Sequence, residues 1–450
     1  MSNYDQMIGV LVGRYSSLES ANSSADLTIV HSDDPMPTYC HSTIFLAGPS
    51  CRFEEGMVIE ESWRHRAVEI LRKSGYTGHV FVPIPKKFFE GIGTTVLETL
   101  EHYDEQIKWE DQALARADVI VFYLERSDKN TGLTTNIEFG RYLESRRMVY
   151  GHPFDAVSVR YLDQQVAKRG YQVHLEANEG DDGALTGVIK EAIERIGEGA
   201  ERKGGECLVP LLYWRTGQFQ EWYQNIVSAG NVLVGFVPKT AITLSDSGTK
   251  YHNDGQLFGY AAWVKIHVKA EDRYIDNEWI FSRTHASYVV PFYIDPKGKR
   301  HFVFIKEFRS PVNNSQGFVY GVPGGTSPDG DIDPIDNAMQ ELREETGIDI
   351  KERSRYKVLG NRQMFAAFST SKIFAVGIQL TEEEFLAAKE SADRGEVHGA
   401  DPEERCKIVI LTEEEYVKQY EFYPVDFTTL GILHLVDHMF EANGTVLPTK

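Results

Sequence analysis

Three glutamate residues in the C-terminal third of the sequence have a spacing that suits metal binding. Glu341, Glu344 and Glu345 occupy positions i, i+3 and i+4, so on a helix their carboxylates project from one face. Like charges at this spacing weaken a helix unless something neutralises them. A hard divalent cation such as Mg²⁺ does so through carboxylate oxygens, and it can bridge a substrate's phosphates. Gly324-Gly325 allows the preceding loop to approach a ligand closely, and Gly347 fits the end of the helix.

A fourth glutamate, in the N-terminal half, has a position that suits covalent chemistry. Glu138 follows the apolar strand Asp118–Leu124, and we expect it in the first turn of a helix. The positive end of the helix dipole would stabilise its anion, and Thr134, Thr135 or Asn136 can cap the helix. An ionised carboxylate in a pocket can attack an anomeric carbon whose leaving group is a purine or pyrimidine. A favourable helix charge without chemistry is the alternative.

From residue 42 onward, short strands that are apolar on both faces alternate with helices. The expected strands are 43–47, 80–83, 118–124, 148–150 and 172–175, and the expected helices are 61–73, 107–116, 135–147, 159–168 and 183–196. This alternation predicts an α/β fold with a doubly wound parallel sheet that is covered on both sides. Ligands bind such sheets beyond the carboxyl ends of the strands. Gly48-Pro49-Ser50 and the loop Glu125–Asn136 would lie there.

The rest of the chain does not show this alternation of short buried strands and helices. Gly197–Gly205 is charged and glycine-rich, which makes it the best linker candidate. Val209–Val237 carries aromatic residues at helical spacing and predicts a bridging helix, with a ligand cage as the alternative. Tyr288–Tyr293 and His301–Glu307 predict a hairpin that begins an α+β region. We therefore expect a lead-in with one or two edge strands over 1–41, a domain over 42–197, a linker and bridging helix over 198–245, and a second domain over 246–450.

The stretch from Gly324 to Ile348 resembles the Nudix box, whose pattern is G-x5-E-x7-R-E-U-x-E-E-x-G-U with U an aliphatic residue. The resemblance implies a Nudix α/β/α sandwich in which Glu341, Glu344 and Glu345 bind Mg²⁺ (or Mn²⁺). The reaction it implies is attack by water on a nucleoside diphosphate linked to another group.

The flanks of this box are similar to the ADP-ribose pyrophosphatase branch of the family. An Arg309-Ser-Pro-Val element precedes a proline and the double glycine. The resemblance implies that Arg309 contacts the substrate, with Gly325 as a further contact; an ordinary surface arginine is the alternative for Arg309. Family members also carry an acidic residue on a late loop that acts as a base or an extra ligand. Glu396, Glu403 and Glu404 are the candidates here.

Residues 42–197 resemble the nucleoside 2-deoxyribosyltransferase family and its nucleotide-hydrolysing relatives. Two motifs carry the resemblance, Ile44-Phe-Leu-Ala-Gly-Pro-Ser50 and the Ala117-Asp-Val strand with its later Glu138-Phe-Gly-Arg. It implies a flavodoxin- or Rossmann-like fold and a nucleophilic role for Glu138.

The same resemblance implies further contacts in this domain. Sugar or 5′-phosphate oxygens would be held by Gly48, Ser50, Thr134 and Asn136. Glu110 and Asp111 are candidates for contacting the base or acting as an acid. We expect a structural role for Asp118, because it opens a buried strand. Relatives commonly complete their sites across subunits, so the resemblance also implies a homo-oligomer.

Composition limits the classes of partner. The 450 residues are 42% apolar and 25% charged, enough for ordinary globular cores in two or three domains. A formal charge of −20 repels nucleic acid and anionic lipid, and the apolar runs are of strand length, so we expect neither nucleic acid nor a membrane as a partner. Four scattered cysteines and no signal-peptide pattern favour a cytoplasmic protein.

Together the two resemblances predict a bifunctional, nucleotide-processing enzyme with a small-molecule substrate. In one version the first domain removes nicotinamide from NAD and the second cleaves the resulting ADP-ribose to AMP and ribose 5-phosphate. In another, the Nudix domain acts first on a modified triphosphate. Gln340 and Phe45 stand where the families have an arginine and a tyrosine. The alternative is therefore a catalytically weakened nucleotide-binding sensor or regulator, with a defence role included.

Overall fold

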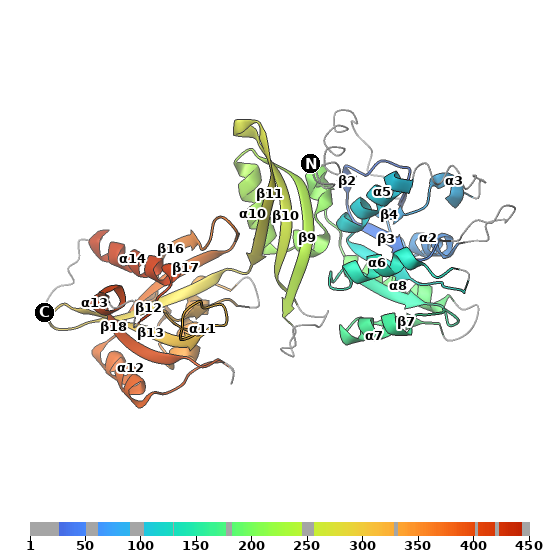
Figure 1. Ribbon diagram of the computed structural model, residues 1–450. Helices are drawn as coiled ribbons and strands as arrows, with labels where there is room; N and C mark the ends of the chain where they lie inside the picture. The colour runs from blue at the N-terminus through green and yellow to red at the C-terminus, as the bar shows by residue number, and fades with distance from the viewer. Residues whose placement is uncertain are drawn as a thin grey trace. The chain divides into compact units, whose positions relative to one another are not determined.

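The computed structural model describes residues 27–50, 62–90, 103–128, 130–176, 182–244, 256–327, 332–400, 404–418 and 423–442 (Figure 1). The chain divides into two compact units, Met1–Trp279 and Ile280–Lys450. Residues 246–279, which the sequence analysis placed in the second domain, belong to the first unit in this division. Within the described residues, no helix is long and apolar enough to cross a bilayer.

A parallel sheet forms the centre of the first unit. Its strand order is β1-β4-β3-β5-β6-β7, and every neighbouring pair is parallel. The strands are β1 (Thr28–His31), β3 (Thr43–Ala47), β4 (His79–Val82), β5 (Val119–Tyr123), β6 (Met148–His152) and β7 (Val173–Leu175). Strands β3, β5 and β6 are buried at every residue, so apolar side chains are needed on both faces. The doubly wound sheet is confirmed, and β1 is an edge strand of the lead-in.

Helices cover both faces of this sheet (Figure 1). One core contains α2 (Trp63–Lys73) and α8 (Gly183–Ile196) against β3 and β5, and the other contains α5 (Tyr103–Arg116), α6 (Leu133–Tyr142) and α7 (Arg160–Lys168). A short helix α3 (Lys86–Phe89) follows β4. Apart from α3, which was not predicted, these helices lie where the apolar spacing predicts them, with the bounds shifted by up to five residues.

The segment after α8 is not a free linker. Strand β8 (Arg202–Lys203) pairs with β2 (Tyr39–Cys40), and a 3₁₀ turn η1 (Gly204–Leu208) leads to α9 (Leu211–Trp214). Arg202 is fully buried, and Leu211 belongs to the same core as α2 and α8. The linker predicted over Gly197–Gly205 is therefore wrong at its end, because Arg202 enters the interior as part of an ion pair with Asp118.

The bridging helix predicted over Val209–Val237 is wrong in its second half. Helix α10 (Gly217–Ser228) ends before Gly230, and the chain continues as strand β9 (Val232–Leu244). Strand β9 pairs antiparallel with β10 (Gln256–Val268), and β11 (Arg273–Arg283) completes a three-stranded sheet, with a turn η2 (Lys269–Glu271) between β10 and β11. The aromatic residues of α9 and α10 pack on one another and on Phe236 of β9, which favours core packing over a ligand cage.

The second unit is built on a mixed sheet of order β14-β13-β12-β17-β16, with β15 beside β12 and β18 beside β13. Its strands are β12 (Ala286–Ile294), β13 (Arg300–Phe308), β14 (Phe318–Gly321), β15 (Gly324–Gly325), β16 (Lys357–Gln363), β17 (Lys372–Gln379) and β18 (Lys407–Thr412). The predicted hairpin of β12 and β13 is confirmed.

Two helical layers sandwich this sheet. Helices α11 (Pro334–Thr346) and α12 (Glu382–Arg394) share one core with β12, β13 and β17, while α13 (Glu413–Lys418) and α14 (Phe427–Ala442) share the other. A turn η3 (Arg353–Arg355) lies between α11 and β16. The unit is therefore an α/β/α sandwich, as expected for a Nudix-like domain.

Candidate functional site

Helix α11 begins and ends as its sequence predicts. The side chain of Asp333 accepts hydrogen bonds from the backbone nitrogens of Ile335 (2.8 Å) and Asp336 (3.4 Å), and Pro334 occupies the first turn. Gly347 follows the last turn with φ +72°, a left-handed conformation that glycine adopts without strain. Between these ends, the three predicted carboxylates share one side of the helix.

Glu341 lies directly against the double glycine. A Cβ placed on Gly325 would be 2.5 Å from Oε1 of Glu341 and 3.1 Å from Oε2, so only glycine leaves room for the carboxylate. The Asn337 side chain donates a hydrogen bond of 3.0 Å to the Gly325 carbonyl oxygen, which ties the loop to α11. The close approach expected of this loop is therefore made to Glu341.

Glu345 is the most buried of the three glutamates, with 6% of its surface exposed. Its Oε2 accepts a 2.8 Å hydrogen bond from the backbone nitrogen of Gly324. Burial, and then the charge of Glu341, raise the pKa of Glu345 well above its usual value. Two neighbouring carboxyl groups held away from water are costly when both are ionised, and a bound cation would remove that cost.

Glu344 completes the group. Its Oε1 accepts a 3.0 Å hydrogen bond from the Gln340 side chain and lies 3.7 Å from an Arg343 nitrogen. Burial raises the pKa of Glu341 to about 7, with further contributions from Glu344 and then from Glu404. The structure thus brings the three predicted glutamates together, and Gln340 takes the position next to Glu344.

Two further side chains of types that can bind a metal lie at this site and were not predicted from the sequence. Ligand atoms of Glu307, Glu345 and Cys406 all lie within 4.8 Å of one another. Glu307 is on β13 two positions after Ile305, on the same face as Val303, which packs in the core beneath α11. The alternation along this strand could have placed Glu307 facing the glutamate helix.

Arginine side chains lie beside the carboxylates. Arg309, predicted to contact substrate, is exposed, and its Nε is 2.8 Å from Glu307. Arg283, which the sequence analysis did not select, donates a 2.8 Å hydrogen bond to the Thr326 hydroxyl, next to Gly325. Burial, and then the charge of Arg309, lower the pKa of Arg283. Two guanidinium groups near one another suit a ligand with more than one phosphate.

A cleft of about 640 Å³ opens beside α11. It is lined by Arg343, Glu344, Val397, His398, Gly399, Ala400, Glu404 and Arg405. Among the late-loop candidates, Glu404 lines this cleft, whereas Glu396 is exposed and pairs with Arg394 at 2.9 Å. Glu403 lies outside the described residues.

The first unit holds a second group of carboxylates, around Glu138. Helix α6 begins at Leu133 after Gly132, which has φ +57° and provides no side-chain cap. Glu138 is therefore in the second turn, and the capping by Thr134, Thr135 or Asn136 is wrong. Burial raises the pKa of Glu138 to about 7, with a further contribution from Glu110. The expected stabilisation of its anion by the first turn of the helix is not met, because Glu138 lies beyond that turn and burial and the charge of Glu110 favour its neutral form.

The carboxylates near Glu138 come from helix α5. Glu110 accepts a 2.8 Å hydrogen bond from Gln106, and burial raises its pKa. Asp111 forms an ion pair with Arg141 of α6. Both acidic residues thus lie on the helix that faces Glu138, where the sequence analysis proposed base-contacting or acid groups.

Arg64 organises the loop after β3, and sequence reasoning missed it. This buried side chain donates hydrogen bonds to the carbonyl oxygens of Leu46 (3.1 Å), Gly48 (2.7 Å) and Pro49 (3.2 Å), and to the Ser50 hydroxyl (3.3 Å). It also weakens the rise in the pKa of Glu138. An arginine one residue after Trp63 and three before Ala67, on the apolar side of a predicted helix, was the available signal.

The remaining residues that the sequence singled out in this unit differ in burial. Gly48 is packed tightly, since a Cβ there would be 2.3 Å from the Tyr123 carbonyl oxygen. Thr134 and Asn136 are exposed, and Asn136 accepts a 2.6 Å hydrogen bond from Arg126. Phe45 is in the core, 6.4 Å from the ring of Trp109.

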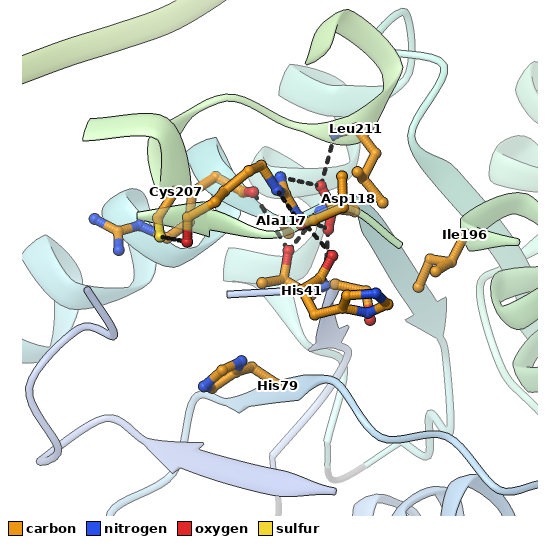
Figure 2. Close-up of polar contacts among 12 residues, drawn as sticks. His41, His79, Ala117, Asp118, Ile196, Cys207 and Leu211 are labelled. Atoms are coloured by element: carbon orange, nitrogen blue, oxygen red, sulfur yellow. Dashed lines mark hydrogen bonds and ion pairs between the residues drawn. The ribbon is translucent and has the colours of Figure 1, made fainter. Parts of the chain in front are cut away.

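Asp118 has structural partners, as expected. Figure 2 shows hydrogen bonds converging on its carboxylate. The donors are Arg202 (2.8 and 2.6 Å) and the backbone nitrogens of Thr43 (2.8 Å) and Leu211 (2.7 Å). Both charged side chains are buried. Such a saturated carboxylate holds the sheet to the segment after α8 and offers no oxygen for chemistry.

The two family models that match this chain fall in different units. Residues 41–155 match the family model described as nucleoside 2-deoxyribosyltransferase like, and residues 283–429 match the NUDIX domain model. No curated protein matches the chain. Among the solved structures that match is one named "Crystal structure of ADP compounds hydrolase", at 17% identity and a TM-score of 0.30, covering 48% of this chain and 99% of that chain. Two separate stretches of this chain therefore match two family models, the first described as nucleoside 2-deoxyribosyltransferase like and the second as NUDIX domain.

Proposed function

We propose that the Nudix domain is a Mg²⁺-dependent pyrophosphatase that acts on a nucleoside diphosphate derivative such as ADP-ribose or NAD. The observation that carries this proposal is the contact between Glu341 and Gly325, with Glu344 and Glu345 beside it on α11. Three carboxylates gathered against a glycine turn form an oxygen-donor set that fits a hard divalent cation. Mg²⁺ would neutralise diphosphate charge and favour the ionised form of water.

The side chains around this set would bind and orient the substrate. Arg309 and Arg283 would hold diphosphate oxygens by charge-assisted hydrogen bonds, and their contacts with Glu307 and Thr326 support this role. Glu404, on the cleft wall, is the described late-loop residue best placed to take a proton from the attacking water. Water attacks one phosphorus, the bond from that phosphorus to the bridging oxygen breaks, and two phosphomonoesters leave.

For the first unit we propose cleavage of an N-glycosidic bond, with Glu138 as the nucleophile. The observation that favours it is the pKa of about 7 in a carboxylate group shared with Glu110, since such perturbed pairs suit acid and base roles. The ionised Glu138 attacks the anomeric carbon and the bond to the base nitrogen breaks with its electron pair, so that nicotinamide leaves NAD as a neutral base, whereas a purine or pyrimidine would take up a proton from water. Water or a second base then releases the sugar.

The two reactions fit successive handling of one metabolite. Removal of nicotinamide from NAD would yield ADP-ribose, which the Nudix domain would cleave to AMP and ribose 5-phosphate. The test is to incubate the protein with Mg²⁺ and NAD, ADP-ribose or nucleoside triphosphates, and to separate the products by chromatography. Binding of these compounds without turnover of any would overturn both proposals and favour a nucleotide sensor.

Variants assign each product to its site. With NAD and ADP-ribose supplied in separate assays, Glu341→Gln should abolish cleavage of added ADP-ribose and leave nicotinamide release from NAD intact, whereas Glu138→Ala should do the reverse. Glu383→Gln, on the exposed start of α12, is the matched control and should change neither. Loss of both nicotinamide release from NAD and cleavage of directly supplied ADP-ribose in a single variant would contradict two independent sites.

A further inference from the structure

A buried thiol lies among the carboxylates of the Nudix site. Cys406 is 2% exposed, and its Sγ is 3.8 Å from Oε1 of Glu345. Together with Glu307 it forms a group whose ligand atoms all lie within 4.8 Å of one another. The three side chains come from β13, α11 and the segment before β18, so residues far apart in the sequence converge on one point.

The backbone fixes the position of this thiol. Cys406 exchanges two backbone hydrogen bonds of 2.9 Å with His398, and β18 begins directly after it and pairs with β13 over six residues, including Ile408 with Ile305. Glu307 therefore projects from a neighbouring strand of a rigid sheet. Glu345 is held from the other side by the Gly324 backbone nitrogen. A donor set held on rigid elements loses little freedom when it binds an ion.

The chemistry of these donors differs from that of the three-glutamate set. A thiolate is a soft ligand that selects Zn²⁺, Co²⁺ or Cd²⁺, whereas Mg²⁺ requires hard oxygen ligands. Two carboxylates and one sulfur leave a fourth position open, which is the ligand count of zinc sites that also bind water or substrate. Glu341 and Glu344 do not belong to this group.

We propose that Glu307, Glu345 and Cys406 form a second cation subsite, which takes a thiophilic divalent cation of the Zn²⁺ class. On binding, the thiol releases its proton to solvent and the thiolate supplies the electron pair of the metal–sulfur bond. The inference rests on the proposed function for one point only, the sharing of Glu345 with the Mg²⁺ set. Through that shared ligand, a Zn²⁺-class ion competes with Mg²⁺ for the site.

Co²⁺ is the probe, because a bound thiolate gives it a charge-transfer absorption in the near ultraviolet that oxygen ligands do not give. The metal-free, full-length protein is titrated with Co²⁺, and Zn²⁺ is then added in competition. We expect the band in the wild-type protein, its loss on addition of Zn²⁺, and its loss in Cys406→Ser. Zn²⁺ affinity in Cys406→Ser, measured by equilibrium dialysis, should fall by more than about 10-fold, since even outer-shell changes reach that size.

Two controls keep the result interpretable. Cys207→Ser removes a thiol of the first unit and should keep the band, and thermal unfolding checks that Cys406→Ser is folded. A wild-type protein without the band, or a band that persists in folded Cys406→Ser, overturns the subsite. If the wild type then still cleaves ADP-ribose with Mg²⁺, the proposed function stands without it. A Cys406-dependent band in a protein that cleaves no nucleotide would support the subsite and overturn the function.

Discussion

Replacing Gly325 by alanine tests the geometry of the glutamate site most directly. The added Cβ would lie 2.5 Å from Glu341 Oε1 and 3.0 Å from its Cδ. Non-bonded heavy atoms ordinarily lie about 3.5 Å or more apart, which is roughly 1 Å longer than the distance from this Cβ to Oε1. Gly325 is not one of the described glycines with a positive φ, so the backbone at this position accepts alanine. The strain therefore falls on the Glu341 carboxylate, which must move by about 1 Å.

A displacement of that size is large for a metal ligand and small for the fold. Metal–ligand distances tolerate only about 0.2 Å, and a misplacement of about 1 Å at a reacting centre costs about 100-fold in rate. We expect Gly325→Ala to lower kcat for Mg²⁺-dependent cleavage of ADP-ribose by about 100-fold, while the free energy of unfolding in urea changes by less than about 1 kcal/mol.

Gly298→Ala is the matched control for this experiment. Gly298 lies in the β12–β13 turn with φ +80°, and no described atom lies within 4 Å of its added Cβ. Alanine there should cost about 1 kcal/mol of stability through backbone strain and leave kcat unchanged. Wild-type kcat and Mg²⁺ dependence in Gly325→Ala would refute the assignment of Glu341 as a ligand held by this turn.

Three further outcomes follow from the structure. Burial raises the pKa of Glu138 to about 7, so its neutral form contributes stability that is lost as pH rises through 7. Glu138→Gln should therefore raise Tm at pH 8 and leave Tm unchanged at pH 4. A Tm shift of equal size at both pH values would contradict this. Base release by the wild type should increase from pH 6 to pH 8 as the Glu138 carboxylate forms, and a flat pH–rate profile would exclude it as the nucleophile. Arg202→Met should lower the free energy of unfolding by about 3–5 kcal/mol in urea, because it leaves Asp118 buried and unpaired, whereas Lys203→Met, at an exposed neighbour, should change it by less than about 1 kcal/mol.

Much of the fold could be predicted because local patterns agree with it. Strands such as Thr43–Ala47 are buried on both faces, so their uninterrupted apolar runs are visible in the sequence. The glutamates of α11 could be predicted for a similar reason, since helical spacing places them together without knowledge of the rest of the fold.

The errors arise where tertiary contacts decide. Val232–Leu244 forms a strand because β10 pairs with it, and nothing local to the sequence gives that partner. The position of Glu138 within α6 depends on a left-handed glycine at 132, and its pKa depends on Glu110 from another helix. Cys406 and Glu307 lie about 100 positions apart, so only the sheet register reveals their proximity.

The buried ion pair between Asp118 and Arg202 limits where the chain can be cut into fragments that fold on their own. The family match ends at residue 155, and the apolar pattern ends near 197, so either would serve as a natural cut point for expression. A fragment truncated there would lose the guanidinium and the Leu211 amide that saturate an interior anion. It would fold poorly for a reason unrelated to its own strands and helices. A cut after α10 retains Arg202 as the counterion of Asp118. We therefore expect the shortest fragment that folds on its own to extend beyond residue 155, where the family match ends.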